Sequence, residues 1–303
     1  MNNKRTLAVD LKRNWKIYLL ALPVLAYFII FHYIPMGGLL MAFQSYSPRL
    51  GIWGSKWVGF ENFQNFFDSY YFTRLVRNTF LISFYDLLLG FPIAIILALM
   101  LNEVRSKPFK KTIQTVSYMP YFISTVVVAG ILIDFCKTNG ALNDIVTMFG
   151  GERMNLLGDP KLFRPIYVGS NIWQRTGYNS IIYMAALSSI DQTLYEAATI
   201  DGANRWRQTW HVTLPGIAST IVITLILRIG SIMNVGFEKV ILLYSPSTYE
   251  TADIISSFVY RKGIIEADYG YSTAIGMFNS VINFVLIIGA NALSKKYSET
   301  SLF

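Results

Sequence analysis

The stretch "EAATIDGANRWRQTWHVTLP", residues 196–215, is polar and helix-forming, and it stands between two long apolar segments. Glu196 and the two alanines after it begin a run of residues with high helix propensity. Gly202 interrupts that run and permits a sharp turn or the close approach of another backbone. A second, amphipathic piece at 206–212 leads to Pro215, which suits the first turn of a further helix. The stretch therefore predicts two short helices joined by a bend.

The chain around this stretch has the composition of a membrane protein. Of its 303 residues, 53% are hydrophobic and 15% are charged, whereas a soluble domain carries about a quarter charged residues. Apolar runs of about 20 residues, enough to span a bilayer as a helix, recur along it. The sequence predicts one all-α, polytopic membrane domain over 1–303, whose six transmembrane helices lie near 17–38, 79–101, 113–135, 165–189, 216–236 and 271–293.

The distribution of Lys and Arg predicts the orientation in the membrane. Basic residues cluster beside the ends of the spans at 4–16, 105–111, 205–207 and 295–296, whereas the other connections carry their charges over long loops. Short cytoplasmic segments are enriched in Lys and Arg. Both termini and the segment at about 191–215 are therefore expected on the cytoplasmic side.

The two long outer loops are expected to carry local structure. Residues 59–72 space aromatic side chains three and four apart, which favours an amphipathic helix that lies at the interface or packs on the bundle. Residues 245–263 indicate a turn followed by a short helix.

The sequence shows no sign of a disulfide, a metal site, nucleic-acid binding, ATP binding or catalysis. Cys136 is the single cysteine and the two histidines are far apart, so neither an internal disulfide nor a metal site is expected. The net charge of +8 is attributed to the cytoplasmic Lys/Arg bias rather than to nucleic-acid binding. No G-x-x-x-x-G-K-[S/T] motif occurs, so ATP is not expected to bind this chain. We expect no catalytic residue, because no cluster of titratable side chains is evident.

On physical grounds alone, residues 196–215 are either an ordinary interfacial loop or a segment that docks on another protein. The pattern E-A-A, three residues, G, then hydrophobic-x-L-P closely resembles the EAA loop of permease subunits in type I ABC importers. That resemblance implies the MetI-like permease fold in a bacterial cytoplasmic membrane. It also implies that the loop couples the chain to an ATPase through Glu196, Ala197, Ala198, Asp201, Gly202, Leu214 and Pro215.

The same resemblance implies an assembly. It predicts a second, related permease subunit, two cytoplasmic ATPase subunits that hold ATP and Mg²⁺, and an extracytoplasmic solute-binding protein. "GFENFQNFF", "NTF" and "MPYFIS" look like carbohydrate-importer permeases, and residues 234–263 are similar to the LplB-like branch, which is associated with oligosaccharides and polysaccharide fragments. A glycan substrate is therefore expected.

The fourth span carries the best candidates for contact with a substrate. Its "WQRTGYN" segment supplies aromatic faces for sugar rings and polar groups for hydroxyls, and polar residues inside a span usually face a cavity. Its candidate residues are Trp173, Gln174, Arg175, Tyr178 and Asn179, and a glycine between them is expected to loosen the helix. The segment lines up with the sugar-contacting stretch of the maltose permease, from which the arginine departs. Packing of the aromatic residues against neighbouring helices is the alternative.

Four further residues are candidates within or near the spans. Asp86 and Arg228 fall at similar depths and are expected either to form a structural ion pair or to contact substrate. Asn234 and Glu238 follow near the outer end of the fifth span and are candidates for the substrate pathway.

Three alternatives to a carbohydrate importer remain open. An EAA loop also suits a permease for another solute, such as a peptide or an osmolyte. A secondary transporter that acts alone would work without an ATPase and often shows inverted repeats, of which none is evident. An integral enzyme would need clustered titratable residues.

Overall fold

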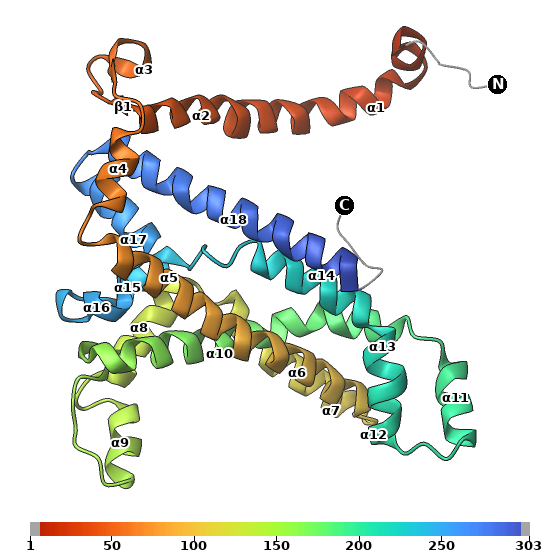
Figure 1. Ribbon diagram of the computed structural model, residues 1–303. Helices are drawn as coiled ribbons and strands as arrows, with labels where there is room; N and C mark the ends of the chain where they lie inside the picture. Colours follow the sequence, from red (N-terminus) through yellow and green to blue (C-terminus); the bar gives the residue numbers. More distant parts are fainter. Residues whose placement is uncertain (1–6, 298–303) are drawn as a thin grey trace.

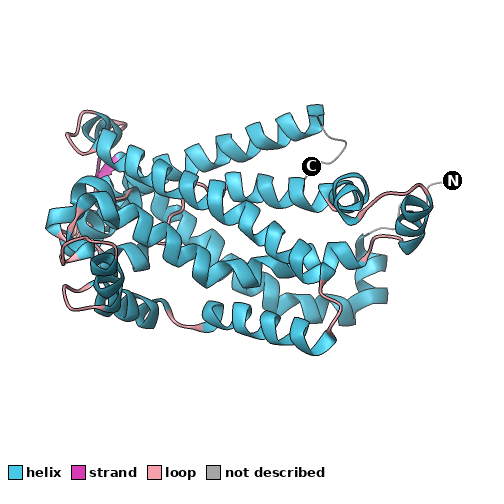
Figure 2. Ribbon diagram, turned by 90° about the horizontal axis from the view of Figure 1, so that it is seen from below, coloured by secondary structure: helices cyan, strands magenta, loops and turns pink. Residues whose placement is uncertain are grey.

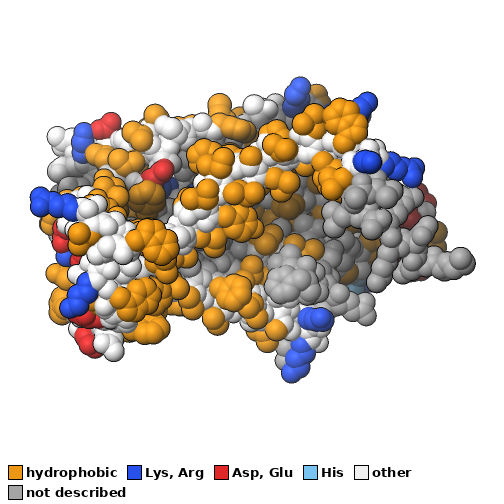
Figure 3. All heavy atoms as spheres, turned by 90° about the horizontal axis from the view of Figure 1, so that it is seen from above, with side chains coloured by type: hydrophobic (Ala, Val, Ile, Leu, Met, Phe, Trp, Pro, Cys, Tyr) orange, Lys and Arg blue, Asp and Glu red, His pale blue; other side chains and the backbone are white. Residues whose placement is uncertain are grey.

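The computed structural model describes residues 7–297, with side chains from 11 to 296. Lys4 and Arg5, which contribute to the expected cytoplasmic charge, and both ends of the chain lie outside these residues. Figure 2 shows the described part as helices that run in roughly one direction, with loops at both ends. Figure 3 shows hydrophobic side chains over the middle of one face and charged side chains toward its two ends, as a bilayer requires.

The first apolar segment is a long helix that stands away from the rest of the chain. It comprises α1 (Leu7–Phe28), η1 (Ile29–Tyr33), α2 (Ile34–Met36) and η2 (Gly37–Phe43). Its most apolar part has no buried residue. Figure 1 shows that only its far end approaches α18 (Tyr269–Tyr297), where η2 makes contact. This chain alone leaves the helix uncovered.

A small lobe follows, which we call the outer lobe after the side on which the sequence predicts it. Strands β1 (Gln44–Ser45) and β2 (Lys56–Trp57) pair antiparallel around α3 (Gly51–Gly54). Helix α4 (Glu61–Phe67) fills only part of the segment at 59–72 for which a helix is predicted. Its Phe66 is fully buried among Phe72 and Phe278, so one face of the segment packs on the bundle, whereas Phe60, Phe67 and Tyr70 are exposed.

Helix α10 (Pro160–Ser188) lies at the centre of the bundle and contacts α6, α7 and α14. The remaining helices up to α10 are α5 (Phe72–Tyr85), η3 (Asp86–Gly90), α6 (Phe91–Glu103), α7 (Lys107–Tyr118), η4 (Met119–Phe122), α8 (Thr125–Cys136), α9 (Ala141–Met148) and η5 (Leu156–Gly158). Gly177 does not loosen α10, which continues through it. A Cβ there would collide with the carbonyl of Ser117, so this glycine lets the backbone of α7 approach α10.

The chain continues after α10 through residues 191–215, which we call the coupling region after the role predicted for it, and later through the connection between α15 and α18, which we call the outer connection after the side predicted for it. These elements are α11 (Gln192–Ile200), α12 (Arg205–Gln208), η6 (Thr209–Thr213), α13 (Leu214–Gly216), α14 (Ala218–Ile229), α15 (Phe237–Leu243), η7 (Pro246–Thr248), α16 (Tyr249–Ala252), α17 (Ile255–Tyr260) and η8 (Arg261–Ile265).

Four segments of the described residues are long and apolar enough to cross a membrane: Leu11–Phe43, Phe72–Glu103, Thr125–Met148 and Tyr269–Lys296. A pair bent by 60°, Arg205–Gly216 with Ala218–Ile229, is a fifth candidate. The chain is thus a mostly helical, polytopic membrane protein.

Two of the predicted spans are not continuous helices. The segment at 113–135 breaks between η4 and α8, where Ile123 and Ser124 have extended backbone and the Ser124 hydroxyl caps α8 by accepting a hydrogen bond from Val127 N. The fifth span ends at Ile229 rather than at 236, and residues 230–236 form turns and extended backbone before α15. Hydrophobicity alone did not reveal either break.

Candidate functional site

The coupling region has the predicted form of helix, bend and helix. Helix α11 ends at Ile200, and Gly202 turns the chain with φ of +75°, a backbone conformation that glycine adopts without strain. Asn204 then caps α12 by accepting a hydrogen bond from Arg207 N. Helix α12 begins one residue earlier than predicted and continues through η6 into α13, so Pro215 lies within the helical run.

One prediction about this region is wrong. Glu196 does not begin a helix but is the fifth residue of α11, which starts at Gln192. The N-cap is Asp191, whose carboxylate accepts a hydrogen bond from Thr193 N. This bond lowers the pKa of Asp191 below its usual value. Asp191, rather than Glu196, is therefore the anion that caps the helix, and a helix-dipole role no longer explains the glutamate.

The coupling region is tied to the bundle along one side and exposed along the other. Arg205 Nη1 contacts Glu103 Oε2 at 3.0 Å, and the hydroxyls of Tyr195 and Thr213 lie 3.0 Å apart. Ile200 is 86% exposed and Trp206 is 70% exposed. Figure 1 shows α11 and α12 projecting at the opposite end of the molecule from α9 and α16. Apolar side chains presented on such a projection suit a protein partner.

Five of the residues predicted to couple, Glu196, Ala197, Ala198, Asp201 and Gly202, lie in α11 and the bend after it, whereas Leu214 and Pro215 lie in α13. Glu196, Ala197, Asp201, Gly202 and Pro215 are exposed, whereas Ala198 and Leu214 are partly buried. Nothing in the chain lies within 4 Å of the position of a Cβ on Gly202. The chain itself therefore leaves the space beside Gly202 open, and a partner could occupy it.

Two cavities flank the middle of α10. The first, which we call the Arg228 cavity, has a volume of about 130 Å³ and lies between η3, α10 and the end of α14. The second, the Lys239 cavity, has a volume of about 460 Å³ and lies between α8, α10 and α15. Both are lined by Asn171 and Arg175. They are therefore adjacent spaces that share one wall.

The structure brings most of the predicted pathway residues to these cavities. Asn179 and Asn234 line the Arg228 cavity, and Gln174 and Glu238 line the Lys239 cavity. Gln174 is buried and donates to the Ile123 carbonyl at 3.2 Å, at the break before α8.

The two aromatic residues of the fourth span are placed differently. Tyr178 stacks on Tyr121 with ring centroids 3.7 Å apart and lines a larger hollow beside the Arg228 cavity. Trp173 is half exposed and lines neither of the two named cavities.

Asp86 and Arg228 approach each other as the sequence suggests. The carboxylate Oδ2 and the guanidinium Nη1 are 4.0 Å apart, and both residues line the Arg228 cavity. No carboxylate of residues 11–296 lies within ion-pair distance of Arg175, although its side chain is exposed to both cavities. Asp86 therefore lies closer to pairing with Arg228 than with Arg175.

Lys239 is a site residue that the sequence did not reveal. It is only 4% exposed, donates to Asn171 Oδ1 at 2.9 Å and lies 5.5 Å from the centre of the Tyr167 ring. Within the described part of the chain, no carboxylate is in ion-pair distance of it. The two cavities are lined by three basic side chains, Arg175, Arg228 and Lys239, against two acidic ones, Asp86 and Glu238. They carry one positive charge in excess, which favours an anionic ligand.

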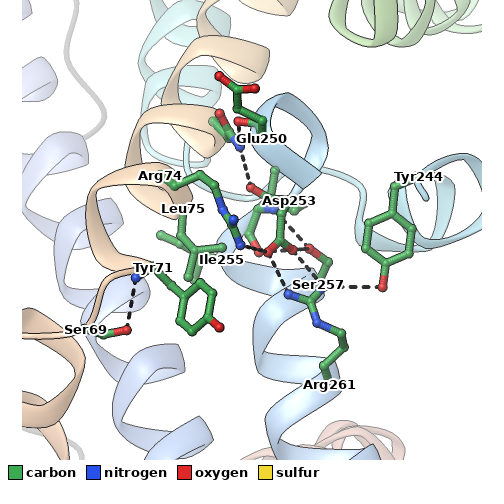
Figure 4. Close-up of polar contacts among 12 residues, drawn as sticks. Ser69, Tyr71, Arg74, Leu75, Tyr244, Glu250, Asp253, Ile255, Ser257 and Arg261 are labelled. Carbon is green, nitrogen blue, oxygen red and sulfur yellow. Dashed lines mark hydrogen bonds and ion pairs between the residues drawn. The ribbon is translucent and has the colours of Figure 1, made fainter. Parts of the chain in front are cut away.

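A buried carboxylate anchors the outer connection behind these cavities, and sequence reasoning missed it. Asp253 is fully buried and accepts two hydrogen bonds from Arg261, at 2.8 and 2.6 Å, and one from Arg74 at 3.1 Å (Figure 4). Burial disfavours a charged guanidinium, but the hydrogen bonds to Asp253 and Tyr244 raise the pKa of Arg261 above its usual value.

The same connection is bonded a second time to α5 and, through a side chain of α5, to α10. Asn78 on α5 donates to the carbonyls of Glu250 and Asp253, and Arg164 on α10 donates to Asn78 Oδ1 at 2.7 Å. The connection between α15 and α18 is thus fixed to α5 and α10.

Comparison with known proteins identifies the family of the chain. A sequence profile of the family "Binding-protein-dependent transport system inner membrane component" matches residues 90–299. The chain belongs to this family. It is a membrane-embedded permease, which is a translocation subunit rather than an enzyme.

The permease is similar to curated proteins over almost its whole length. Protein LplB of Bacillus subtilis (strain 168) is 48% identical over 97% of this chain and 92% of the relative. The polygalacturonan/rhamnogalacturonan transport system permease protein YteP of the same organism is 42% identical over 99% of this chain and 94% of the relative.

A solved structure shows the same fold. A chain in the crystal structure of a bacterial alginate ABC transporter, in complex with an alginate pentasaccharide-bound periplasmic protein, is 44% identical to the permease. The TM-score is 0.90, and the match covers 98% of this chain and 100% of that one. At this identity, the likeness supports the MetI-like permease fold.

We expect substitutions of Gly202 to separate folding from docking. Asn tolerates a positive φ better than most residues, and the chain leaves open space at this position. Gly202→Asn and Gly202→Asp should therefore accumulate in membranes at the wild-type level. Both should lower transport by about tenfold or more if the bend meets a partner, because bulk is added, and for Asp also charge, where that partner would bind.

Gly169→Ala is the matched control, because Gly169 also has open space around its Cβ position but lies in α10. Copurification of the ATPase and substrate uptake are measured for each variant. Normal uptake with Gly202→Asp would contradict a docking role for the bend.

Proposed function

We propose that the chain is a permease subunit of an ATP-driven, binding-protein-dependent importer for oligosaccharides or polysaccharide fragments. One structural observation carries the mechanism: the coupling region joins α10 directly to α13 and α14. Helices α10 and α14 contribute Arg175 and Arg228, respectively, to the Arg228 cavity. A partner that moves the region therefore acts on two walls of the cavity at once.

The lengths of the helices make this transmission direct. Arg175 is thirteen residues before the end of α10, which corresponds to about 20 Å of rigid helix. A tilt at the coupling end is carried along that length without a flexible joint. We infer that closure of a partner ATPase pair moves α11 and α12 and opens the cavities alternately to the two sides of the membrane.

The uncovered first helix supports a second permease subunit. Its apolar surface would face lipid or protein, and Tyr27, Phe28 and Phe31 give it a large aromatic surface. A helix that makes contact with its own bundle only at its outer end gains its other packing from elsewhere. We infer that a related permease covers it in the assembly.

The remaining parts of the proposal follow from the family and the charge pattern. The permease has six spans when α7 and α8 are counted as one broken span and α10 as another. Both termini and the coupling region are cytoplasmic. Two ATPase subunits bind ATP and Mg²⁺ on that side, and a solute-binding protein delivers the glycan to the outer lobe. The polysaccharide named for YteP and the alginate of the solved transporter support a glycan substrate.

The unpaired Arg175 supports selection of acidic sugars. A guanidinium binds a carboxylate through two parallel hydrogen bonds, and a charge at this depth is retained only with a partner or a wet cavity. Since Asp86 lies near Arg228, Arg175 is the side chain that we expect to meet a uronate.

The proposed function is tested by reconstitution. The permease, its partner permease and the ATPase subunits are purified together and placed in liposomes with the solute-binding protein. We expect ATP-dependent uptake of labelled oligosaccharides and no ATP hydrolysis by this chain alone. An ATPase variant that lacks the P-loop lysine is the control. Uptake that persists without any ATPase would support a stand-alone transporter, and uptake of peptides but not of glycans would support another solute.

The role of Arg175 is tested in the same liposomes with Arg175→Gln. We expect KM for oligogalacturonate to rise by about tenfold or more, because a charge-assisted bidentate contact is lost, while KM for a neutral galactan oligosaccharide stays within twofold. Arg105→Gln removes an exposed cation outside the cavities and should change neither value. Equal loss for both glycans together with less protein in the membrane would show that Arg175 is structural.

A further inference from the structure

The break between α14 and α15 places polar backbone groups in the interior of the bundle, and side chains satisfy them. Met233 N donates to Asn283 Oδ1 on α18 at 3.0 Å. The Tyr167 hydroxyl donates to the Gly236 carbonyl at 3.2 Å. The broken segment is therefore held at both ends.

A fixed chain of amides starts from that backbone group. A backbone N–H can only donate, so the atom of Asn283 that faces Met233 is the carbonyl oxygen and the other atom is the amide nitrogen. That nitrogen, Nδ2, lies 3.1 Å from Asn234 Oδ1. Asn279, one helical turn earlier on α18, also donates its Nδ2 to the same oxygen at 3.1 Å. Asn279 and Asn283 are 9% and 8% exposed, so water competes little for these bonds.

The orientation of the Asn234 amide follows from these contacts. Its oxygen has two lone pairs and both are used by α18. Asn234 lines the Arg228 cavity. Because its oxygen faces α18, its Nδ2 group is the part of the amide that faces this cavity. The residue is exposed, and in the described part of the chain its Nδ2 makes no hydrogen bond. The cavity therefore contains an oriented N–H donor between the two helices that carry its cations.

We propose that Asn279 and Asn283 are positioning residues that aim the amide N–H group of Asn234 at the substrate, where it donates to an acceptor oxygen of the glycan. The inference rests on the proposed function and adds a specificity-determining donor to it. The donor is neutral, so it recognises a hydroxyl, ring or carboxylate oxygen and complements the charged contact of Arg175. A fixed donor loses little conformational entropy on binding, since α18 has already oriented it.

Asn234→Asp is the direct test. Aspartate keeps an oxygen that accepts from both Asn279 and Asn283, so its bonds to α18 remain. Its second oxygen, an acceptor, replaces the N–H donor that faces the cavity. We expect KM for uptake of oligogalacturonate by the assembled transporter to rise by about tenfold or more with kcat within twofold. Ser231→Asp is the matched control, because Ser231 lines the same cavity and bonds only within its own helical turn. It adds the same charge to the same cavity without touching the bonds between Asn234 and α18, so it measures the charge effect alone, and its rise in KM should be smaller than that of Asn234→Asp by about threefold or more.

Asn283→Asp tests the positioning step without changing any side chain that lines the cavity. Its oxygen still accepts from Met233 N, but it can no longer donate to Asn234. The amide of Asn234 should then turn its nitrogen toward the new carboxylate, while the Asn279 amide reverses so that its oxygen, which has no partner in the described structure, accepts from the same nitrogen. We expect the same rise in KM as with Asn234→Asp. Ser280→Ala, on an exposed face of α18, should behave as wild type. If Asn283→Asp does not accumulate in membranes, the comparison of Asn234→Asp with Ser231→Asp decides alone.

The outcomes separate the two proposals. Equal KM values for Asn234→Asp and Ser231→Asp would show a charge effect only and would overturn the role of Asn234 as a hydrogen-bond donor to the substrate. A wild-type KM with Asn234→Asp would overturn that role as well. A wild-type assembly that takes up neither oligogalacturonate nor a neutral galactan oligosaccharide would instead refute the proposed function, and the inference with it.

Discussion

Each backbone N–H and carbonyl inside a bilayer needs a partner from the protein, because the hydrocarbon offers none. Continuous helices meet this need by themselves, so each break in a helix must be satisfied by side chains. Gln174 donates to the Ile123 carbonyl at the break before α8, and Asn283 accepts from Met233 at the break after α14. Both breaks also line the cavities beside α10. Polar side chains of the bundle interior thus satisfy both breaks, and both breaks lie beside the cavities.

The same constraint connects the pathway to the coupling region. Helix α10 is continuous from the cavities to its end at Ser188, so a displacement of α11 is carried along it, whereas the helical run that begins with α12 is bent by 60° where it joins α14. The outer connection is comparatively rigid, because Asp253 accepts bonds from Arg74 and Arg261 while its carbonyl binds Asn78. Motion is therefore expected at the breaks, where few backbone hydrogen bonds resist it, rather than at the outer lobe.

Much of the coupling region could be predicted from the sequence because its signals are local. Alanines, a glycine and a proline at fixed spacing determine helix, bend and helix whatever surrounds them. The helix start was misplaced because Asp191 caps α11 before the E-A-A motif begins. The broken spans were missed because hydrophobicity does not report backbone conformation. Lys239, Asp253 and the asparagines of α18 were missed because their meaning depends on neighbours that are distant in sequence.

We expect the two breaks to line a water-filled pathway that opens alternately to the two sides of the membrane. Thiol accessibility in the reconstituted transporter, with Cys136 replaced by serine, measures this opening. A membrane-impermeant thiol reagent is added from outside to Ser231→Cys, in the Arg228 cavity, and to Met100→Cys, which is exposed on the apolar surface of α6. The account predicts that the first cysteine reacts at least about tenfold faster in one nucleotide state than in the other, because only the thiolate in contact with water reacts, and that the second stays unreactive. Equal rates at Ser231→Cys with and without ATP, or no reaction in either state, would contradict it.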